Sequence, residues 1–409
     1  MDNKTNKARV AGGAGYALAG RFGAIIEAAS FIAFTWLYGA ATFGLYAVLW
    51  SYVKVSSAVC EMAMTTALQR YIPKASKENE SNIVGYAIKL SLLISLVAAL
   101  VLVFAAPYLT QFINASEADT EHLVTVVRIY AWVLPLWCFV NVTTAAVRAT
   151  RNFGPEVKVR IFYEQGLRLI TASMLATLGF LTYGLFIAHL LSIFLSAILA
   201  AKLAARYFDL KSIISAPITG STAREILQYG RLVMPAYLVK MLFSEFPVIF
   251  LNMLLPGSAG AAAGGFYSVA RKIASALQAV HKTFEYVMAP LAAEKDGSGD
   301  HAALADMFAY ATRLSITLIL PFAAALLLAR HDILSVMRPE FQAASTAIAI
   351  LCVGRVLEAA SGPSAVIIEM LGHRALPAFN GIMGFMVLVG IGSILIPKLG
   401  VTGAAIAAA

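Results

Sequence analysis

The chain has 409 residues, of which 60% are hydrophobic and only 13% are charged, and its formal net charge is +9. This composition excludes an ordinary soluble domain. The basic residues lie mostly in short connections between apolar runs, so the positive charge reflects membrane topology and not nucleic-acid binding. Because the runs are about twenty residues long, unlike the roughly ten-residue strands of a barrel, the chain is predicted to be an all-α polytopic membrane protein.

Twelve apolar runs, taken in chain order, predict the membrane-spanning helices. They cover residues 12–38, 43–68, 84–107, 123–147, 161–181, 184–204, 232–255, 266–291, 304–329, 343–370 and 377–396, and a twelfth opens at Val401. The last run breaks off at Ala409, where no helix would naturally end, so we expect the twelfth span to be truncated in this sequence.

Connections that are rich in Lys and Arg alternate along the chain with connections that are poor in them. The N-terminus and the connections after the second, fourth and sixth runs are basic, whereas the connection around Glu117 and Glu121 is acidic. This bias predicts a cytoplasmic N-terminus. The longest connection separates an N-terminal lobe (1–206) from a C-terminal lobe (231–409) by a cytoplasmic linker (207–230), in which Ala223–Tyr229 is predicted to form a short amphipathic helix.

The second and eighth runs share a polar stripe and several letters at a constant offset. Gly44, Tyr46 and Val48 reappear as Gly265, Tyr267 and Val269. Since each lobe holds six runs, an even number, the lobes have the same orientation and form a parallel repeat. The two stripes, at helical steps of three and four, are Ser51, Lys54, Ala58, Glu61 and Thr65 in the second run and Arg271, Ser275, Gln278, Lys282 and Glu285 in the eighth.

Charged residues at membrane depth are the candidate functional residues, since a charge at the centre of a membrane helix costs at least ~2.5–3.5 kcal/mol. Besides the stripes, the first run carries Arg21 and Glu27 and the seventh carries Lys240 and Glu245. Three interpretations stay open for them: lining of a polar cavity between two facing halves, pairing between helices, and snorkelling to the membrane surface. The pairs Glu164 with Arg168 and Arg355 with Glu358 are predicted to be ion pairs within a helix.

Sequence motifs of catalytic or metal-binding sites are weak in this chain. The histidines form no ligand cluster, and single residues such as His189 and His281 are predicted to be satisfied by their neighbours. The three cysteines lie in apolar runs without metal-ligand spacing, and no Walker loop or nucleophile elbow is present. The sequence therefore predicts no metal site, no cofactor and no enzymatic activity.

The stretch from Gly39 to Arg70 resembles the opening of the polysaccharide-biosynthesis flippases. Its Gly-x-Tyr at Gly44 and Tyr46, and its Arg70–Tyr71 at the end of the second run, match the pattern of that family. The closing IPKLGVTGAAIA is similar to the start of that family's twelfth span. These flippases belong to the multidrug, oligosaccharidyl-lipid and polysaccharide (MOP) exporter superfamily, whose drug-extruding and peptidoglycan-precursor branches share the architecture.

The resemblance implies two pseudo-symmetric six-helix lobes around a central cavity, as in the MATE transporters, in the plasma (cell inner) membrane. It implies an exporter that moves a lipid-linked, undecaprenyl-diphosphate-type oligosaccharide to the outer leaflet by alternating access, amid membrane lipids. Candidate contacts of the anionic cargo are Lys54, Arg271, Lys282, Gln278, Arg21 and Lys240. The acids Glu61, Glu27, Glu245 and Glu285 would balance charge or bind a coupling proton or sodium ion. An ion-coupled multidrug exporter of the same fold is the alternative, and a membrane ligase or polymerase is a third hypothesis.

Overall fold

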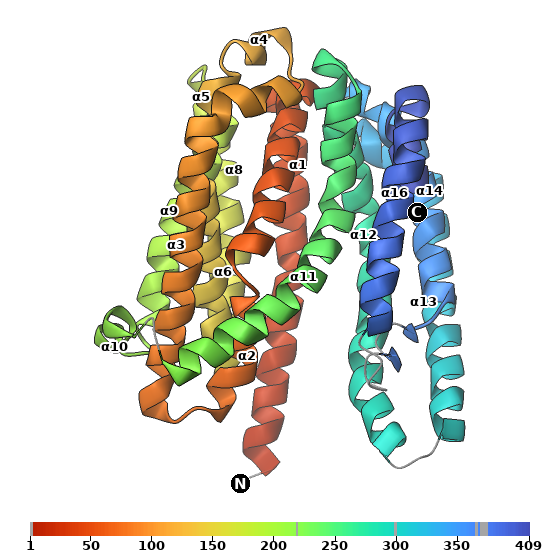
Figure 1. Ribbon diagram of the computed structural model, residues 1–409. Helices are drawn as coiled ribbons and strands as arrows, with labels where there is room; N and C mark the ends of the chain where they lie inside the picture. The colour runs from red at the N-terminus through yellow and green to blue at the C-terminus, as the bar shows by residue number, and fades with distance from the viewer. Residues whose placement is uncertain (1–2, 218–219, 298–300, 365–366, 369–374) are drawn as a thin grey trace. The chain divides into compact units, whose positions relative to one another are not determined.

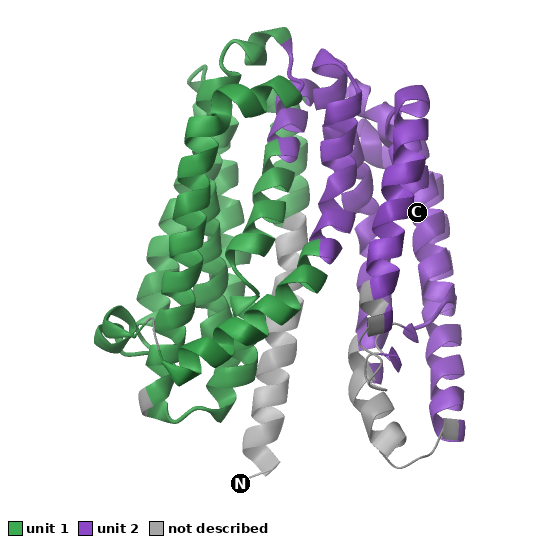
Figure 2. Cartoon of the chain, in the orientation of Figure 1, with its two compact units in different colours: residues 1–39, 49–113, 117–238 green, residues 40–48, 114–116, 239–409 purple. Residues whose placement is uncertain are grey.

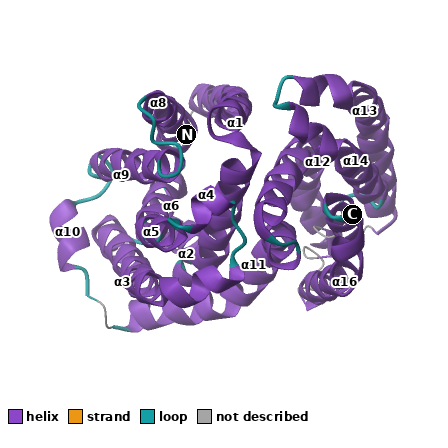
Figure 3. Cartoon of the chain, turned by 90° about the horizontal axis from the view of Figure 1, so that it is seen from above, coloured by secondary structure: helices purple, strands orange, loops and turns teal. Residues whose placement is uncertain are grey.

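The computed structural model describes the backbone of residues 3–217, 220–297, 301–364, 367–368 and 375–409. Side chains are described from Ile26 onward, apart from 78, 218–219, 286–287, 289–301, 365–366, 369–375 and 377–378. Helices and short loops make up this part of the chain, and no strand occurs among the described residues (Figures 1 and 3). The predicted all-α fold class is thereby confirmed.

The chain divides into two compact units, coloured in Figure 2. Unit 1 consists of residues 1–39, 49–113 and 117–238, and unit 2 consists of residues 40–48, 114–116 and 239–409. Two short segments of the N-terminal half, 40–48 and 114–116, thus belong to the same unit as the C-terminal half. The helices α1 (Asn3–Cys60) and α11 (Ser221–Leu254) each contribute to both units.

Unit 1 is built around α6 (Val133–Ala149), which packs against α3 (Lys77–Leu109) and α9 (Gly184–Ala204). The helix α8 (Glu164–Thr177) packs against α9 in turn. An apolar core of buried residues from α2, α3, α6 and α11 includes Met64, Val84, Val142 and Ile226. The remaining elements of the unit are α2 (Met64–Tyr71), η1 (Ile72–Lys74), η2 (Thr110–Phe112), α4 (Glu117–Thr120), α5 (Leu123–Tyr130), α7 (Gly154–Glu156), η3 (Val157–Tyr163) and α10 (Leu210–Ser215).

Unit 2 is built from α12 (Gly257–Gly297), α13 (His301–Ser335) and α14 (Ser345–Ala360), which pack against one another. The short helix η4 (Pro339–Ala344) precedes α14, and α16 (Ala375–Leu399) packs against α17 (Val401–Ala408). Large apolar side chains such as Phe341 and Tyr267 are almost fully buried in this unit.

Eight helices of the described residues are long and apolar enough to cross a membrane, judged by length and composition alone. They account for most of the twelve predicted spans. The first predicted span and the larger part of the second form the single long helix α1, which is kinked at Gly39, where a φ of 81° favours glycine. Three predicted spans are not among these eight helices. The fifth lies in η3 and α8, the eighth in the charge-bearing α12, and the twelfth in α17.

Two local predictions were wrong. The second span is not continuous from 43 to 68, because α1 ends at Cys60 and α2 begins only at Met64. Ala223–Tyr229 is not a separate surface helix, because α11 runs without interruption from Ser221 to Leu254. No proline separates Tyr229 from the seventh apolar run, so the helix continues through the junction.

Candidate functional site

The break in the second predicted span is the most unusual backbone feature of unit 1. Met62 and Ala63 have φ angles of 47° and 53°, in the left-handed region that residues other than glycine rarely adopt. Such a conformation costs on the order of 1–3 kcal/mol per residue and persists only where its surroundings enforce it. In membrane proteins, irregular backbone at membrane depth occurs where it is buried in protein or lines a cavity.

Glu61 lies directly at this break and is only 2% exposed. Its Oε1 accepts a hydrogen bond from Nδ2 of Asn141 on α6 at 2.7 Å, and its backbone carbonyl accepts one from the Ser91 hydroxyl on α3 at 3.5 Å. A Cβ atom on Gly230 of α11 would lie 2.4 Å from the Met62 carbonyl oxygen, so only glycine allows this approach. Three helices distant in sequence therefore hold the break in place.

Glu61 is a buried acid whose charged form is costly at this position. Burying an ionised carboxylate is unfavourable unless a counter-charge compensates it, so such a group favours a bound proton or a nearby cation. In the described part of the chain Glu61 has no salt bridge, and the Oδ1 atom of Asn141 is buried without a hydrogen-bond partner. A carboxylate beside an amide oxygen presents the hard oxygen ligands that small cations prefer. Among the described residues no group of three or more His, Cys, Asp or Glu could hold a metal ion.

Lys54 of α1, seven residues or about two helical turns before Glu61, lies against an aromatic pair. Its Nζ is 5.6 Å from the centroid of the Trp50 ring, and Trp50 meets Trp137 of α6 edge to face at 4.7 Å. Arg160 of η3 covers the other indole, with its Cζ 4.8 Å from the Trp137 centroid.

His189 is buried below Trp50 and is satisfied by its neighbours, as predicted. Its Nδ1 shares a hydrogen bond of 2.7 Å with the Tyr130 hydroxyl, and its Nε2 lies 3.3 Å from Nη1 of Arg168. Arg168 in turn forms the predicted intrahelical pair with Glu164 at 3.7 Å.

In unit 2, Arg271 of α12 and Glu245 of α11 form an interhelical ion pair. Nη2 of Arg271 lies 3.1 Å from Oε2 of Glu245, which is 5% exposed, and Nη1 donates to the backbone carbonyl of Ser244. About two turns farther along α12, Gln278 donates to Glu358 of α14 at 3.5 Å. Within α14, Glu358 pairs with Arg355 at 2.6 Å.

The other predicted residues are more dispersed. Glu285 pairs with Lys282 and lies 3.5 Å from Nε2 of His281, while half of the Lys282 side chain stays exposed at 50%. Lys240 is exposed on α11, and Glu27 is half-buried on α1. The side chain of Arg21 lies outside the described residues. The structure thus brings Arg271 together with Glu245 and Lys282 with Glu285. It places Lys54 near the end of α1 and Glu61 at the break that follows it.

Asn141, Arg160 and the pair Trp50–Trp137 did not appear in the sequence-based set. Asn141 was detectable as a polar amide in the middle of the fourth apolar run. Arg160 was not detectable in this role, since it belongs to the basic connection after the fourth run and has the sequence context of a topology signal.

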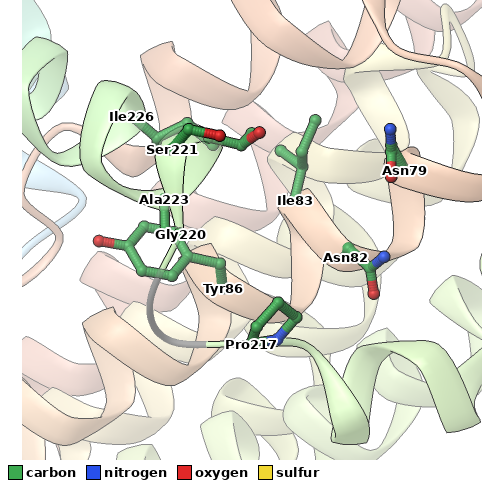
Figure 4. A pocket seen from close by; sticks show the side chains of 10 residues that line it. Asn79, Asn82, Ile83, Tyr86, Pro217, Gly220, Ser221, Ala223 and Ile226 are labelled. Carbon is green, nitrogen blue, oxygen red and sulfur yellow. The ribbon is translucent and has the colours of Figure 1, made fainter.

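A separate cavity of about 170 Å³ lies in unit 1 between the start of α3 and the segment that leads into α11. Asn79, Asn82 and Tyr86 line it from α3, opposite Pro217 and Ser221 (Figure 4). It contains none of the predicted site residues.

These observations define a multi-pass helical membrane protein whose helices carry buried acids, among them Glu61 in unit 1 and Glu245 in unit 2. The model of the polysaccharide biosynthesis protein family matches residues 28–338, and the chain belongs to that family. No curated protein matches the sequence.

Solved structures of the MOP superfamily share the fold. An inward-facing multidrug resistance MATE family transporter has a TM-score of 0.76 at 17% identity, with 94% of this chain and 90% of that chain covered. The lipid II flippase MurJ in an inward closed conformation has a TM-score of 0.75 at 13% identity, covering 96% and 84%. An outward-facing MATE transporter has a TM-score of 0.66 at 18% identity, covering 96% and 90%. The MATE-like fold expected from the sequence is confirmed.

Proposed function

We propose that the chain is a flippase that moves a lipid-linked oligosaccharide, a precursor of surface polysaccharide, from the cytoplasmic to the outer leaflet of the cell inner membrane. It has a cytoplasmic N-terminus and works by alternating access of the two lobes, 1–206 and 231–409. The observation that carries the proposal is the buried Glu61 at the interrupted second span, in a member of the polysaccharide biosynthesis family.

Glu61 is the residue that couples transport to a proton or sodium ion. It is buried without a salt bridge in the described part of the chain, so its charge state must change the stability of its surroundings. Glu245 and Glu285 have cationic partners and serve charge balance. Glu27 serves the same purpose in the first span.

The basic residues at membrane depth bind the anionic diphosphate of the cargo. Lys54, Arg271 and Lys282 are the principal contacts, and Gln278, Arg21 and Lys240 are secondary ones. A cation in surroundings of low dielectric attracts a phosphate more strongly than it does in water.

The test is the display of surface polysaccharide in a strain that lacks the gene. The double variant Lys54→Ala, Lys282→Ala should abolish display while the protein is still made and inserted. Two exposed lysines from two different connections, changed together as Lys158→Ala with Lys211→Ala, are the matched control and should leave display intact. Unchanged polysaccharide in the first double variant would overturn the proposal.

A multidrug exporter is the second candidate, favoured by the buried acids Glu61 and Glu245 and by the fold shared with MATE transporters. An exporter of organic cations needs acids and aromatic residues more than it needs Lys54 or Lys282. Ethidium efflux from cells that depends on Glu61 but is unaffected by the Lys54→Ala, Lys282→Ala variant would favour this function over the first.

A further inference from the structure

A line of contacts in unit 1 joins two cations through two indole rings. Lys54 lies over Trp50, Trp50 meets Trp137 at an interplanar angle of 86°, and Arg160 lies over Trp137. Each indole therefore supports one cation on its electron-rich face. We call these four residues, from α1, α6 and η3, the indole–cation group.

The orientation of the indole pair is fixed by His189, which packs against Trp50. The His189 ring packs against Trp50 with centroids 4.6 Å apart, and both nitrogens of that ring are engaged by Tyr130 and Arg168. His189 is fully buried, and Trp137 is only 9% exposed. A polar chain buried at this depth fixes the orientation of an aromatic surface, since neither the histidine nor its partners can rotate without leaving hydrogen bonds unmade.

The guanidinium of Arg160 makes only a long ion pair within the protein. Its nearest acid, Glu156, is 3.7 Å away, and the same carboxylate accepts two hydrogen bonds from Arg148 at 2.7 and 3.0 Å. The Arg160 side chain is 33% exposed, against 18% for Glu156. A guanidinium has five N–H donors in a planar fork that matches a phosphate. Arg160 therefore keeps donors for a ligand while Arg148 satisfies the acid.

We propose that the indole–cation group is a binding subsite for the diphosphate of the cargo, in which Arg160 makes the bidentate contact and Lys54 supplies a second positive charge. This subsite rests on the proposed function. It assigns binding of the charged end of the lipid to these four residues of unit 1. Trp137 and Trp50 replace water beneath the two cations, which keeps the cations extended and strengthens their attraction to an anion. Arg160 is thus a binding residue, although its sequence position is that of a topology signal.

The fluorescence of the protein offers a direct test, because Trp50 and Trp137 are two of only four tryptophans. The purified full chain in detergent is titrated with farnesyl diphosphate, farnesyl monophosphate and farnesol. We expect binding to weaken in that order, with a fluorescence change that disappears in Trp50→Phe and Trp137→Phe. The change should persist in Trp36→Phe and Trp132→Phe, whose rings are 51% and 40% exposed.

Substitutions of Arg160 test the cation itself. Arg160→Ala should weaken diphosphate binding about tenfold or more, equivalent to ~1.4 kcal/mol. Arg160→Lys should recover part of the affinity, because it restores the charge but not the fork. Lys158→Ala, an exposed cation two residues away, is the matched control and should bind as the parent does. Arg160→Gln, which can still hydrogen-bond, serves if the alanine variant does not fold.

The outcomes separate the subsite from the proposed function. If the parent protein binds farnesyl diphosphate and Arg160→Ala and Arg160→Gln bind it equally well, the subsite is wrong and the flippase proposal stands. If the parent distinguishes none of the three probes, both are wrong. If the fluorescence change follows Trp36 or Trp132, the ligand binds elsewhere and the subsite is again wrong.

Discussion

The Cα atom of Gly44 lies 3.0 Å from the point that a Cβ atom on Gly265 would occupy, so the backbones of α1 and α12 touch at these two glycines. The two residues are also the opening letters of the repeated segments, in which Gly44 matches Gly265 and Tyr46 matches Tyr267. Close backbone packing through small residues is a usual way for membrane helices to associate. Gly44 and Gly265 therefore serve the close packing of α1 against α12 within unit 2.

Substitution of Gly44 should destabilise the protein. A Cβ atom there would lie 1.9 Å from the carbonyl oxygen of Ala261, a backbone atom that cannot move aside alone. Gly44→Ala should cost about 1–3 kcal/mol, the usual range for overpacking, and lower the melting temperature in detergent. Gly166→Ala is the control, because nothing lies within 4 Å of its added methyl group and alanine favours a helix. Equal melting temperatures for the two variants would show that the α1–α12 contact is looser than described.

Hydropathy predicted most of the spans, because a run of apolar residues must cross a membrane as a helix whatever surrounds it. The break at Glu61 was not predictable by the same reasoning. Its neighbours Ala, Met and Glu are all strong helix formers, so local propensity favours a continuous helix. The break depends on Asn141 and Gly230, which reach it from α6 and α11.

The contact of Arg160 with Trp137 was not predictable from the sequence for a different reason. The residue lies in η3, a π-helical segment of seven residues that precedes α8. Each extra residue in a π-helical turn rotates the side chains that follow away from the 3.6-residue period. Spacing counted at 3.6 residues per turn therefore does not predict the face on which Arg160 lies. The charged stripe of α12, which is regular, placed Arg271, Gln278 and Lys282 on one helix correctly.

Asn252 is expected to hold the segment 114–116 in unit 2. Its side chain donates to the Asn114 carbonyl at 2.7 Å and accepts from the Asn114 amide at 3.1 Å, while Asn114 bonds the Asn252 carbonyl and the Gly257 amide. Asn252 is completely buried. Asn252→Ala should leave the Asn114 groups unpaired, at a cost of about 1–3 kcal/mol for each buried group.

Amide hydrogen exchange measures this effect locally. Peptides that cover Asn114 should exchange faster in Asn252→Ala, whereas Asn152→Ala, at an exposed position, should leave them unchanged. Asn252→Asp replaces the donor to the Asn114 carbonyl by a buried carboxylate oxygen, so its exchange should be at least as fast as in Asn252→Ala. Unaltered exchange around Asn114 in Asn252→Ala would mean that other contacts hold the segment.

The linker helix α10 is expected to respond to acid through Asp209. The carboxylate accepts hydrogen bonds from the Ser212 hydroxyl at 2.6 Å and the Ser212 amide at 2.9 Å, and these bonds hold the pKa of Asp209 below its ordinary value. A depressed pKa means that the capping contribution is complete above the unfolded value of about 3.9 and is lost as the pH falls through the folded value. Exchange of the α10 amides should therefore be faster in Asp209→Ala than in the parent at neutral pH, with a gap that closes in acid. A gap that does not change with pH would exclude the carboxylate as the cap.

Neutralising Glu61 should impair transport without lowering the stability of the fold. Gln has nearly the same shape as Glu, so Glu61→Gln retains an acceptor for the Asn141 amide at the break, but it can neither bind a proton nor attract a cation. Because a neutral amide is far less costly to bury than a charge, the melting temperature should stay equal or rise. Polysaccharide display, under the proposed function, should fall by at least an order of magnitude, and its dependence on external pH or sodium should vanish. Glu117→Gln, an exposed acid of α4, should change neither property. Normal display in Glu61→Gln would assign the coupling role elsewhere, whereas a collapse of the melting temperature would make Glu61 a structural residue of the break.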